Sequence, residues 1–355
     1  MKCEFHTKES IVSSNKKKAF SIYSIILAVV IFSGCSLTIR DKAFLYKEPV
    51  TDPDIHVDVY SPNKAWRGNT ILADNHIYDR PRIIEVDMQG RIIWEYILPL
   101  YLREYNNPGF DVELLPSNNV LFVLPGKGIY EINRKGEVLW SHLDERVSHD
   151  ADRLPNGNTL YVFGNKDEKS DAQVKEVNPK GEIVWSWYAK DEFDKPPYKK
   201  AYYQGWTHTN AVTRMANGNT LISPRNFHCL VEVDPEGKVV KIIGEEYLER
   251  QHDPEILSNG NILVANYQKP HEVLEIDPQT EAIVWRFALP KRRVWPVRDA
   301  DLLPNGNILI TGTTALIEIT PDKEIVWRLK LKNVHFRRRK EAPSLGFYKA
   351  QRTRQ

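Results

Sequence analysis

The sequence predicts an all-β protein, a six-bladed β-propeller of four-stranded antiparallel blades over residues 56–330. The main observation behind this prediction is a unit that recurs six times. Each unit has a turn followed by apolar residues, as in Asn156-Gly-Asn-Thr-Leu-Tyr, and then a Glu that opens a second apolar stretch. These Glu residues are 46, 45, 56, 43 and 43 residues apart and are Glu85, Glu131, Glu176, Glu232, Glu275 and Glu318. A third element ends five of the units in Trp, at Trp94, Trp140, Trp185, Trp285 and Trp327.

Each unit reads as four short strands, which are clearest in the third copy. Residues 149–154 are the expected first strand, and Asn156 and Gly157 form the turn because both tolerate positive φ. Residues 159–164, 173–178 and 182–188 follow as the other three strands. A four-stranded unit with a period in the forties is typical of propeller blades, and we expect the recurrent Trp to pack between neighbouring blades. How the ring closes is left open.

The first 34 residues are predicted to be a signal peptide, and residues 35–55 a lipidated N-terminus with a tether. Three lysines, 16–18, precede an apolar run over residues 22–32 that is too short to span a membrane. The run ends in Ser33-Gly34-Cys35, which resembles a bacterial lipoprotein signal. This resemblance implies acylation of Cys35 and a place on the extracytoplasmic side of a membrane in the cell envelope. An uncleaved anchor or a chance cysteine at this position is the alternative.

Charge is distributed unevenly along the chain. The formal net charge is +2, but residues 1–34 and 331–355 are basic, so the middle of the chain carries about −8. That balance argues against a nucleic-acid-binding core. Three cysteines cannot form a disulfide framework. We expect residues 331–355 to form a basic, solvated and partly disordered tail, with electrostatic attachment to an anionic membrane as the alternative.

One position of the repeat breaks the pattern. It lies eight residues before the turn glycine, at the start of the first strand, which lines the channel of a propeller. Its six occupants are Tyr60, Phe110, His149, Asn210, His252 and Arg298. Packing alone would favour one residue type, whereas these groups differ in chemistry and converge near one mouth of the channel.

Hairpin geometry adds partners to this ring. A two-residue turn at residues 217–218 would place Asn210 opposite Arg225. The same arithmetic sets Gly164 beside His149. It also sets Tyr267 beside His252, and His208 lies two residues before Asn210.

Three imidazoles, an amide and a guanidinium suit a tetrahedral anion. Arginine offers paired charged donors to an oxyanion, and histidine can act as a nucleophile, base or acid near neutral pH. Taken singly, each residue also has an ordinary structural explanation. A three-histidine zinc site is the rival, but a guanidinium beside a dication would be repelled. We therefore expect neither a metal nor a cofactor.

Four segments carry a resemblance to the arylsulfate sulfotransferase family of cofactor-independent, six-bladed propellers. They are His149-Asp, Trp206-Thr-His208-Thr-Asn210, Asn217-Gly-Asn with Arg225 downstream, and His252-Asp-Pro. The resemblance covers about 270 residues. It implies transfer of a sulfuryl group from a phenolic sulfate to a phenolic acceptor through a sulfohistidine.

The resemblance also implies roles for residues. His252 would be the nucleophile, His208, Asn210 and Arg225 would hold the sulfuryl oxygens, and His149 would bind or protonate the phenolic oxygen. Aromatic and charged contacts to the substrate would come from Phe110, Tyr60, Tyr267 and Arg298. The chain departs from the best-known members by lacking their extra N-terminal β-domain and their disulfide, so oligomeric state and substrate range stay open.

Two other classes of protein compete with this interpretation. A non-catalytic propeller lipoprotein, acting as a binding or assembly scaffold in the cell envelope, would also have Trp-bearing blades, but such scaffolds typically use eight. A quinone-cofactor dehydrogenase also prefers eight blades and needs calcium-binding carboxylates. The six-fold count and the ring of His, Asn and Arg favour the enzyme.

Overall fold

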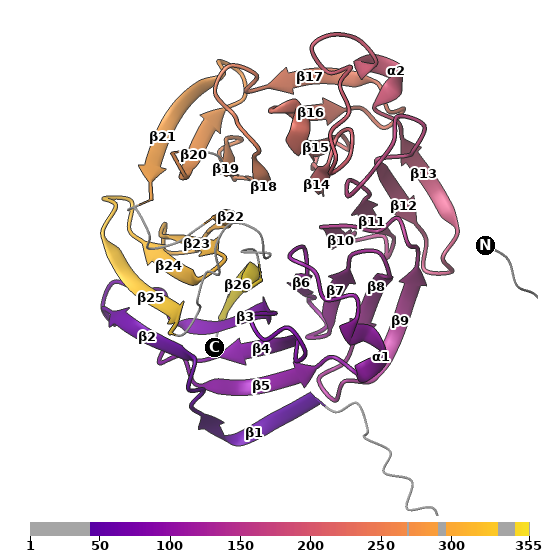
Figure 1. Ribbon diagram of the computed structural model, residues 1–355. Coiled ribbons are helices and arrows are strands. Elements are labelled where there is room, and N and C mark those ends of the chain that lie inside the picture. The colour runs from indigo at the N-terminus through magenta and orange to yellow at the C-terminus, as the bar shows by residue number, and fades with distance from the viewer. Residues whose placement is uncertain (1–42, 268–269, 290–295, 333–344, 355) are drawn as a thin grey trace, which may run out of the picture. The chain divides into compact units, whose positions relative to one another are not determined.

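The computed structural model describes residues 43–267, 270–289, 296–332 and 345–354, and these form a six-bladed β-propeller (Figure 1). The predicted fold class is therefore confirmed. The predicted signal peptide and Cys35 lie outside the described residues. Lipidation at Cys35 stays a prediction, which the mass of the mature N-terminal peptide tests.

The six sheets follow one another around the ring, each starting from an inner strand near the axis (Figure 1). From inside to outside, blade 1 consists of β26 (Phe347–Arg354), β3 (Gly68–Asp74), β4 (Arg82–Val86), β5 (Ile92–Ile97) and β1 (Ala43–Val50). Blade 2 consists of β6 (Asp111–Leu114), β7 (Val120–Leu124), β8 (Gly128–Ile132) and β9 (Val138–Leu143). Blade 3 consists of β10 (Ala151–Arg153), β11 (Thr159–Val162), β12 (Val174–Val177) and β13 (Ile183–Trp187).

Blade 4 consists of β14 (Thr209–Arg214), β15 (Thr220–Pro224), β16 (Leu230–Val233) and β17 (Val239–Ile243). Blade 5 consists of β18 (His252–Ile256), β19 (Ile262–Asn266), β20 (Glu272–Asp277) and β21 (Ala282–Ala288). Blade 6 consists of β22 (Val297–Leu302), β23 (Ile308–Gly312), β24 (Ala315–Ile319), β25 (Ile325–Leu331) and β2 (Ile55–Tyr60). Short helical turns are α1 (Leu100–Arg103), α2 (Lys190–Phe193) and the 3₁₀ turn η1 (Arg225–Phe227).

The repeated residues hold each blade together and join it to the next. In blade 3 the Asn158 side-chain amide donates to the Glu176 carboxylate at 2.6 Å, and every other blade has the same Asn–Glu contact. The repeated Trp reaches across a blade boundary: Trp94 Nε1 donates to the Arg134 carbonyl of blade 2 at 2.8 Å. The predicted packing of Trp between blades is therefore confirmed. In blade 4, Lys241 takes the place of this Trp.

Strands near both ends of the described chain close the ring. The strand β2 forms the outer edge of blade 6, and β26 forms the inner edge of blade 1 by pairing with β3. The expectation of a solvated tail is therefore wrong for Phe347–Arg354. The physical reason is that β3 would otherwise present an unpaired backbone edge to the axis, which β26 satisfies. Buried Arg352 anchors the new strand to blade 6 through Glu318 at 2.9 Å.

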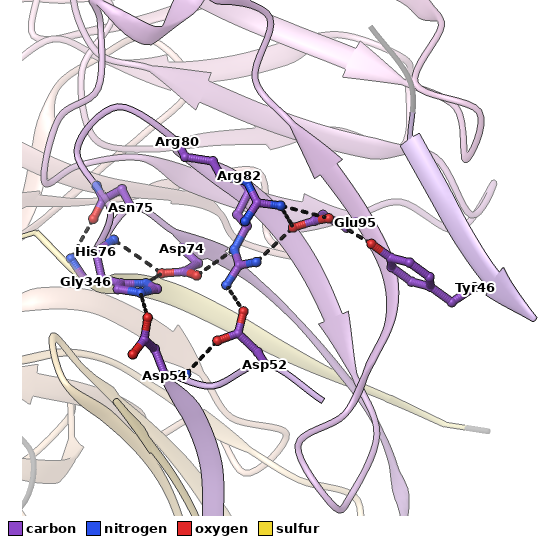
Figure 2. A network of polar contacts seen from close by, with 10 residues as sticks. All are labelled: Tyr46, Asp52, Asp54, Asp74, Asn75, His76, Arg80, Arg82, Glu95 and Gly346. Atoms are coloured by element: carbon purple, nitrogen blue, oxygen red, sulfur yellow. Dashed lines mark hydrogen bonds and ion pairs between the residues drawn. The ribbon is translucent and has the colours of Figure 1, made fainter. Parts of the chain in front are cut away.

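A buried ion-pair network holds the segment that crosses from blade 1 to blade 6 (Figure 2). The Arg82 guanidinium is only 2% exposed and donates to Asp74, Glu95 and Asp52 at 2.8–2.9 Å. Asp52 lies between β1 and β2, so Arg82 fixes the path of the chain as it leaves the outer edge of one blade for the outer edge of another. Breaking one partner would leave a buried charge uncompensated, which costs about 3–5 kcal/mol.

The inner strands of four blades bring carboxyl groups toward one lysine. Lys349, on β26, lies 3.2 Å from Asp150 of blade 3 and 3.2 Å from Asp253 of blade 5. Burial raises the pKa of the surrounding carboxyl groups, which are Asp111, Glu113, Asp150, Asp152, Glu255, Asp299 and Asp301. A cavity of about 540 Å³ adjoins them and is lined by Asp253, Glu255, Asp301 and Lys349 among others.

Replacing Glu255 by Gln should flatten the pH dependence of stability. Burial raises the pKa of this carboxyl group from 4.5 to about 7. The folded state therefore binds the proton more tightly, and this group makes the free energy of unfolding fall as the pH rises from about 4.5 to about 7. After allowance for partial exposure we expect the loss to be about 1–2 kcal/mol.

The free energy of unfolding, measured by urea denaturation at several pH values from about 4.5 to 8, shows the effect. Gln keeps an oxygen that can accept the Leu302 N–H, which Glu255 accepts at 2.7 Å. Glu246→Gln, at an exposed position, is the matched control. If the free energy of unfolding changed with pH equally in wild type and in Glu255→Gln, the raised pKa of Glu255 would be contradicted.

Candidate active site

Three histidines from different blades meet at one mouth of the ring. His149 precedes β10, His208 precedes β14, and His252 begins β18. The His149 and His208 rings are 4.9 Å apart between centroids, edge to face. The Tyr348 ring of β26 lies 5.9 Å from that of His149 and 6.4 Å from that of His252. Residues far apart in sequence therefore share one small volume.

A strained loop places His208. Its φ is 46°, in the left-handed region that non-glycine residues rarely adopt. Asp167 stabilises this conformation by accepting the His208 N–H at 3.1 Å and the Thr207 N–H and hydroxyl at 3.1 and 2.8 Å. Gly164 leaves room for the same loop, because a Cβ on it would lie 2.1 Å from the carbonyl oxygen of Thr209.

Backbone carbonyls fix the tautomers of two histidines. His208 Nδ1 lies 2.7 Å from the Gln204 carbonyl oxygen, and His252 Nδ1 lies 2.9 Å from that of Arg250. A carbonyl only accepts, so in each ring Nδ1 carries the proton and a neutral ring has its lone pair on Nε2. His252 Nε2 lies 3.4 Å from Nη1 of Arg298. The lone pair of His252 thus faces the side from which an anion would come.

The imidazoles are neutral at physiological pH. Burial lowers the pKa of His252 and His149 well below the usual value, with further contributions from the Arg298 and Arg225 charges. Burial and the Arg225 charge lower the pKa of His208 to about 3. A neutral imidazole keeps its lone pair, which both a nucleophile and a general base require.

Two buried guanidinium groups at the site have no carboxylate partner among the described residues. Arg225 and Arg298 are 7% and 8% exposed, and within the described residues no carboxylate pairs with either. Each has an Nε with no hydrogen-bond partner, although Arg225 Nη2 donates to the Gln204 side chain at 3.3 Å and Arg298 Nη1 donates to His252 Nε2 at 3.4 Å. Both lie over the Tyr267 ring, at 5.7 and 5.1 Å from its centroid. A buried, unpaired charge is costly, so this arrangement fits a site for an anionic ligand.

The strand register differs from the predicted one. The turn spans residues 215–219, where the prediction had a two-residue turn. The Met215 N–H donates to the Asn219 carbonyl at 2.8 Å and so sets its length. Ala211 therefore pairs with Ser223, and a bulge contains Asn210. Arg225 begins η1, just beyond the ladder, so it is not directly opposite Asn210 as predicted.

The other two predicted pairs are shifted as well. Gly164 lies against the backbone that enters β14. The prediction had instead paired it with His149. His252 pairs with Ala265, yet its ring stacks on that of Tyr267 at 5.1 Å between centroids. The expected neighbour of His252 is thus present through its side chain although the register is wrong.

Two expected wall residues lie elsewhere. Tyr60 ends β2 and pairs with Trp327 at the outer edge of blade 6, because β26 supplies the inner strand of blade 1. Phe110 is fully buried and contacts the Phe122 ring at 6.1 Å, so it belongs to the core between blades 1 and 2. The predicted place of Tyr60 on an inner strand is therefore wrong. Phe110 follows Gly109, which lies against the His149 ring, but its side chain packs in the core, so its predicted contact with substrate is wrong.

Two residues at the site were missed. Tyr348 was assigned to a solvated tail, but it contacts His149, His252 and Arg298. Gln204 lies in the long connection before β14, where no repeat pattern marks it. Within the described residues no group of three or more His, Cys, Asp or Glu side chains is arranged to hold a metal ion. No helix of that part of the chain is long and apolar enough to cross a membrane.

Comparison with protein families agrees with the geometry. A family model described as arylsulfotransferase (ASST) matches residues 57–257, which is more than half of the chain. The protein belongs to the arylsulfotransferase family. The match includes His149, His208, Asn210, Arg225 and His252. A search of curated proteins finds no match.

Solved structures share the fold of this arylsulfotransferase-family chain. A protein of unknown function from Bacteroides caccae is 18% identical, with a TM-score of 0.56, and the match covers 75% of this chain and 94% of that one. A streptogramin B lyase is 12% identical, with a TM-score of 0.53 and coverage of 83% and 89%. A virginiamycin B lyase from Staphylococcus aureus is 11% identical, with a TM-score of 0.50 and coverage of 83% and 90%. Such identities show the fold alone.

Replacing Gly164 by Ala should disrupt the loop that carries His208. The new Cβ would lie 2.1 Å from the carbonyl oxygen and 2.2 Å from the nitrogen of Thr209, so the backbone must move. We expect a loss of about 3 kcal/mol or more in the free energy of unfolding. Gly126→Ala is the control, because its φ is +80° but nothing lies within 4 Å of the added Cβ. It should cost about 1 kcal/mol, from backbone strain alone. Urea unfolding of both variants decides, and equal losses would contradict the steric argument.

Proposed function

We propose that this protein transfers a sulfuryl group from a phenolic sulfate ester to a phenolic acceptor, with His252 as the nucleophile. The observation that carries the proposal is the pair of buried guanidinium groups of Arg225 and Arg298, neither with a carboxylate partner, beside a neutral His252. The Nε2 lone pair of His252 points toward Arg298, whose Nη1 donates to it at 3.4 Å, and a sulfate that takes over this donor would leave the lone pair available to attack. Membership of the arylsulfotransferase family supports the class of reaction.

In the first step the Nε2 lone pair of His252 attacks sulfur. The bond between sulfur and the aryl oxygen breaks, and the phenolate leaves with the electron pair of that bond. The Nδ1 proton stays on the ring, held by the Arg250 carbonyl, which also disperses the positive charge that develops on the imidazole. Arg225 and Arg298 bind the sulfuryl oxygens, since guanidinium donors match an oxyanion that carries charge in the transition state.

In the second step the oxygen of an acceptor phenol attacks the same sulfur and the N–S bond breaks. The lone pair returns to His252 Nε2, and the phenolic proton goes to a base. His208 suits this role, because its Nδ1–H is bonded to Gln204 and its Nε2 can accept. Two moderate barriers thus replace one high barrier.

The polarity of the atoms alters two roles that the resemblance implied. His208 and Asn210 present acceptors: Asn210 Nδ2 donates to the Gln251 carbonyl at 2.9 Å, and its buried Oδ1 has no partner. These acceptors suit the hydroxyl group of an acceptor phenol better than a sulfuryl oxygen. His149, as a neutral imidazole with one N–H, can donate to the oxygen of the leaving phenolate. The rings of Tyr267 and Tyr348 form the aromatic walls.

Release of 4-nitrophenol from 4-nitrophenyl sulfate, with phenol as acceptor, tests the proposal. Wild type should release it, and His252→Ala should be slower by more than about a thousandfold, because removal of a covalent nucleophile abolishes both steps. His142→Ala is the matched control, since this histidine lies on the outer strand β9 and contacts Tyr161 instead of the site.

Thermal unfolding shows that the variants fold. A rate for His252→Ala equal to that of the control would overturn the role of His252. A folded wild-type protein that releases no phenol from a range of aryl sulfates would overturn the enzyme assignment and favour the non-catalytic scaffold.

A further inference from the structure

A second cavity lies on the rim of blade 4, apart from the three histidines at the axis. Its volume is about 270 Å³, and it is lined by Pro197, Tyr198, Lys200, Tyr202, Asn226, Phe227, His228 and Glu245. Half of its wall comes from the connection between β13 and β14, residues 188–208, which is the longest between consecutive blades. This insertion explains why one spacing of the sequence repeat is 56 residues while the others are 43 to 46.

Three of the eight residues that line this rim cavity are Tyr or Phe. Tyr198 and Phe227 are 8% and 6% exposed, and their rings are 4.9 Å apart between centroids. Tyr202 is 47% exposed and has the Lys200 ammonium 5.2 Å from its ring centroid. An exposed aromatic ring that stands beside two buried ones at a hollow favours a flat apolar ring as the guest.

The polar groups of the rim cavity match a hydroxyl group. His228 Nδ1 accepts the Arg250 N–H at 3.2 Å, and burial lowers the pKa of this imidazole, so the neutral ring carries its proton on Nε2. Glu245 accepts the Tyr198 hydroxyl, and a carboxylate retains further lone pairs. His228 thus offers a donor and Glu245 an acceptor, and a phenol, which both accepts and donates at one oxygen, can satisfy both. The Lys200 ammonium also lines the cavity, as does the Asn226 side chain, whose Nδ2 donates to the Gly205 carbonyl at 2.9 Å.

We propose that the rim cavity is a second ligand site, which binds a small neutral phenol by packing its ring against Tyr202 and Phe227 and pairing its hydroxyl with His228 and Glu245. The ligand class follows from the chemistry of the wall, so the site does not depend on sulfuryl transfer taking place at the axis.

Hydrogen bonds connect the rim cavity to His252. The Arg250 N–H donates to His228, and the Arg250 carbonyl accepts from Nδ1 of His252. Arg250 has a φ of 56°, so its peptide groups hold an uncommon conformation that these two bonds support. A phenol that polarises His228 therefore acts on the residue that sets the tautomer of His252.

A titration with 4-methylphenol, without any sulfate donor, tests the site. The protein is labelled with ¹⁵N-histidine, and resonances are assigned from single histidine variants. We expect a saturable shift of the His228 ring nitrogens, and a smaller shift of those of His252 with the same Kd. Tyr202→Ala should weaken binding about fivefold, through loss of an aromatic contact.

Tyr203→Ala is the matched control, because this neighbouring tyrosine is 92% exposed and does not line the cavity. Its Kd should equal that of wild type. The proposal is overturned if His228 does not shift, if the shifts are confined to the three histidines at the axis, or if the two tyrosine variants bind alike. None of these outcomes bears on release of phenol from an aryl sulfate, so the two proposals fail separately.

Discussion

The pairing of β26 with β3 is the constraint on which the rest of this structure depends. A propeller must join its first and last blades, and here the last strand of the chain supplies the inner edge of blade 1 while β2 supplies the outer edge of blade 6. The strand β26 also carries two adjacent residues to the axis: Tyr348, against the histidines, and Lys349, among the carboxyl groups. The strand that closes the ring therefore also supplies a residue of the candidate site.

The axis separates two opposite electrostatic environments. At the mouth, Arg225 and Arg298 are buried without a carboxylate partner, and burial keeps the imidazoles neutral. Along the inner strands, Lys349 is instead surrounded by carboxyl groups and lies 3.2 Å from both Asp150 and Asp253. The guanidinium groups without such partners thus favour an anion at the mouth. Hydrogen bonds to backbone carbonyls then direct the lone pair of His252 toward the guanidinium groups, which is why geometry, more than any single residue type, supports a nucleophilic role.

Periodicity predicted the fold, because a recurring Asn–Glu contact and a recurring Trp at the blade boundary are local features that a repeat must preserve. The convergence of the histidines followed from the same periodicity. The register did not, since a turn over residues 215–219 and a bulge at Asn210 depend on turn geometry. Tyr348 was missed although a signal was present: Tyr348-Lys-Ala-Gln-Arg matches His149-Asp-Ala-Asp-Arg at Ala and Arg. Both arginines pair with a Glu of the preceding blade.

The central claim is that His252 attacks sulfur and carries the sulfuryl group between donor and acceptor. Peptide mapping by mass spectrometry, after brief exposure to an aryl sulfate without acceptor and an alkaline quench that preserves an N–S bond, tests it most directly. The account predicts one added SO₃ on the peptide that contains His252, located on that ring and removed when a phenol is supplied. Phenol release without any adduct, or an adduct on a different side chain, would contradict it.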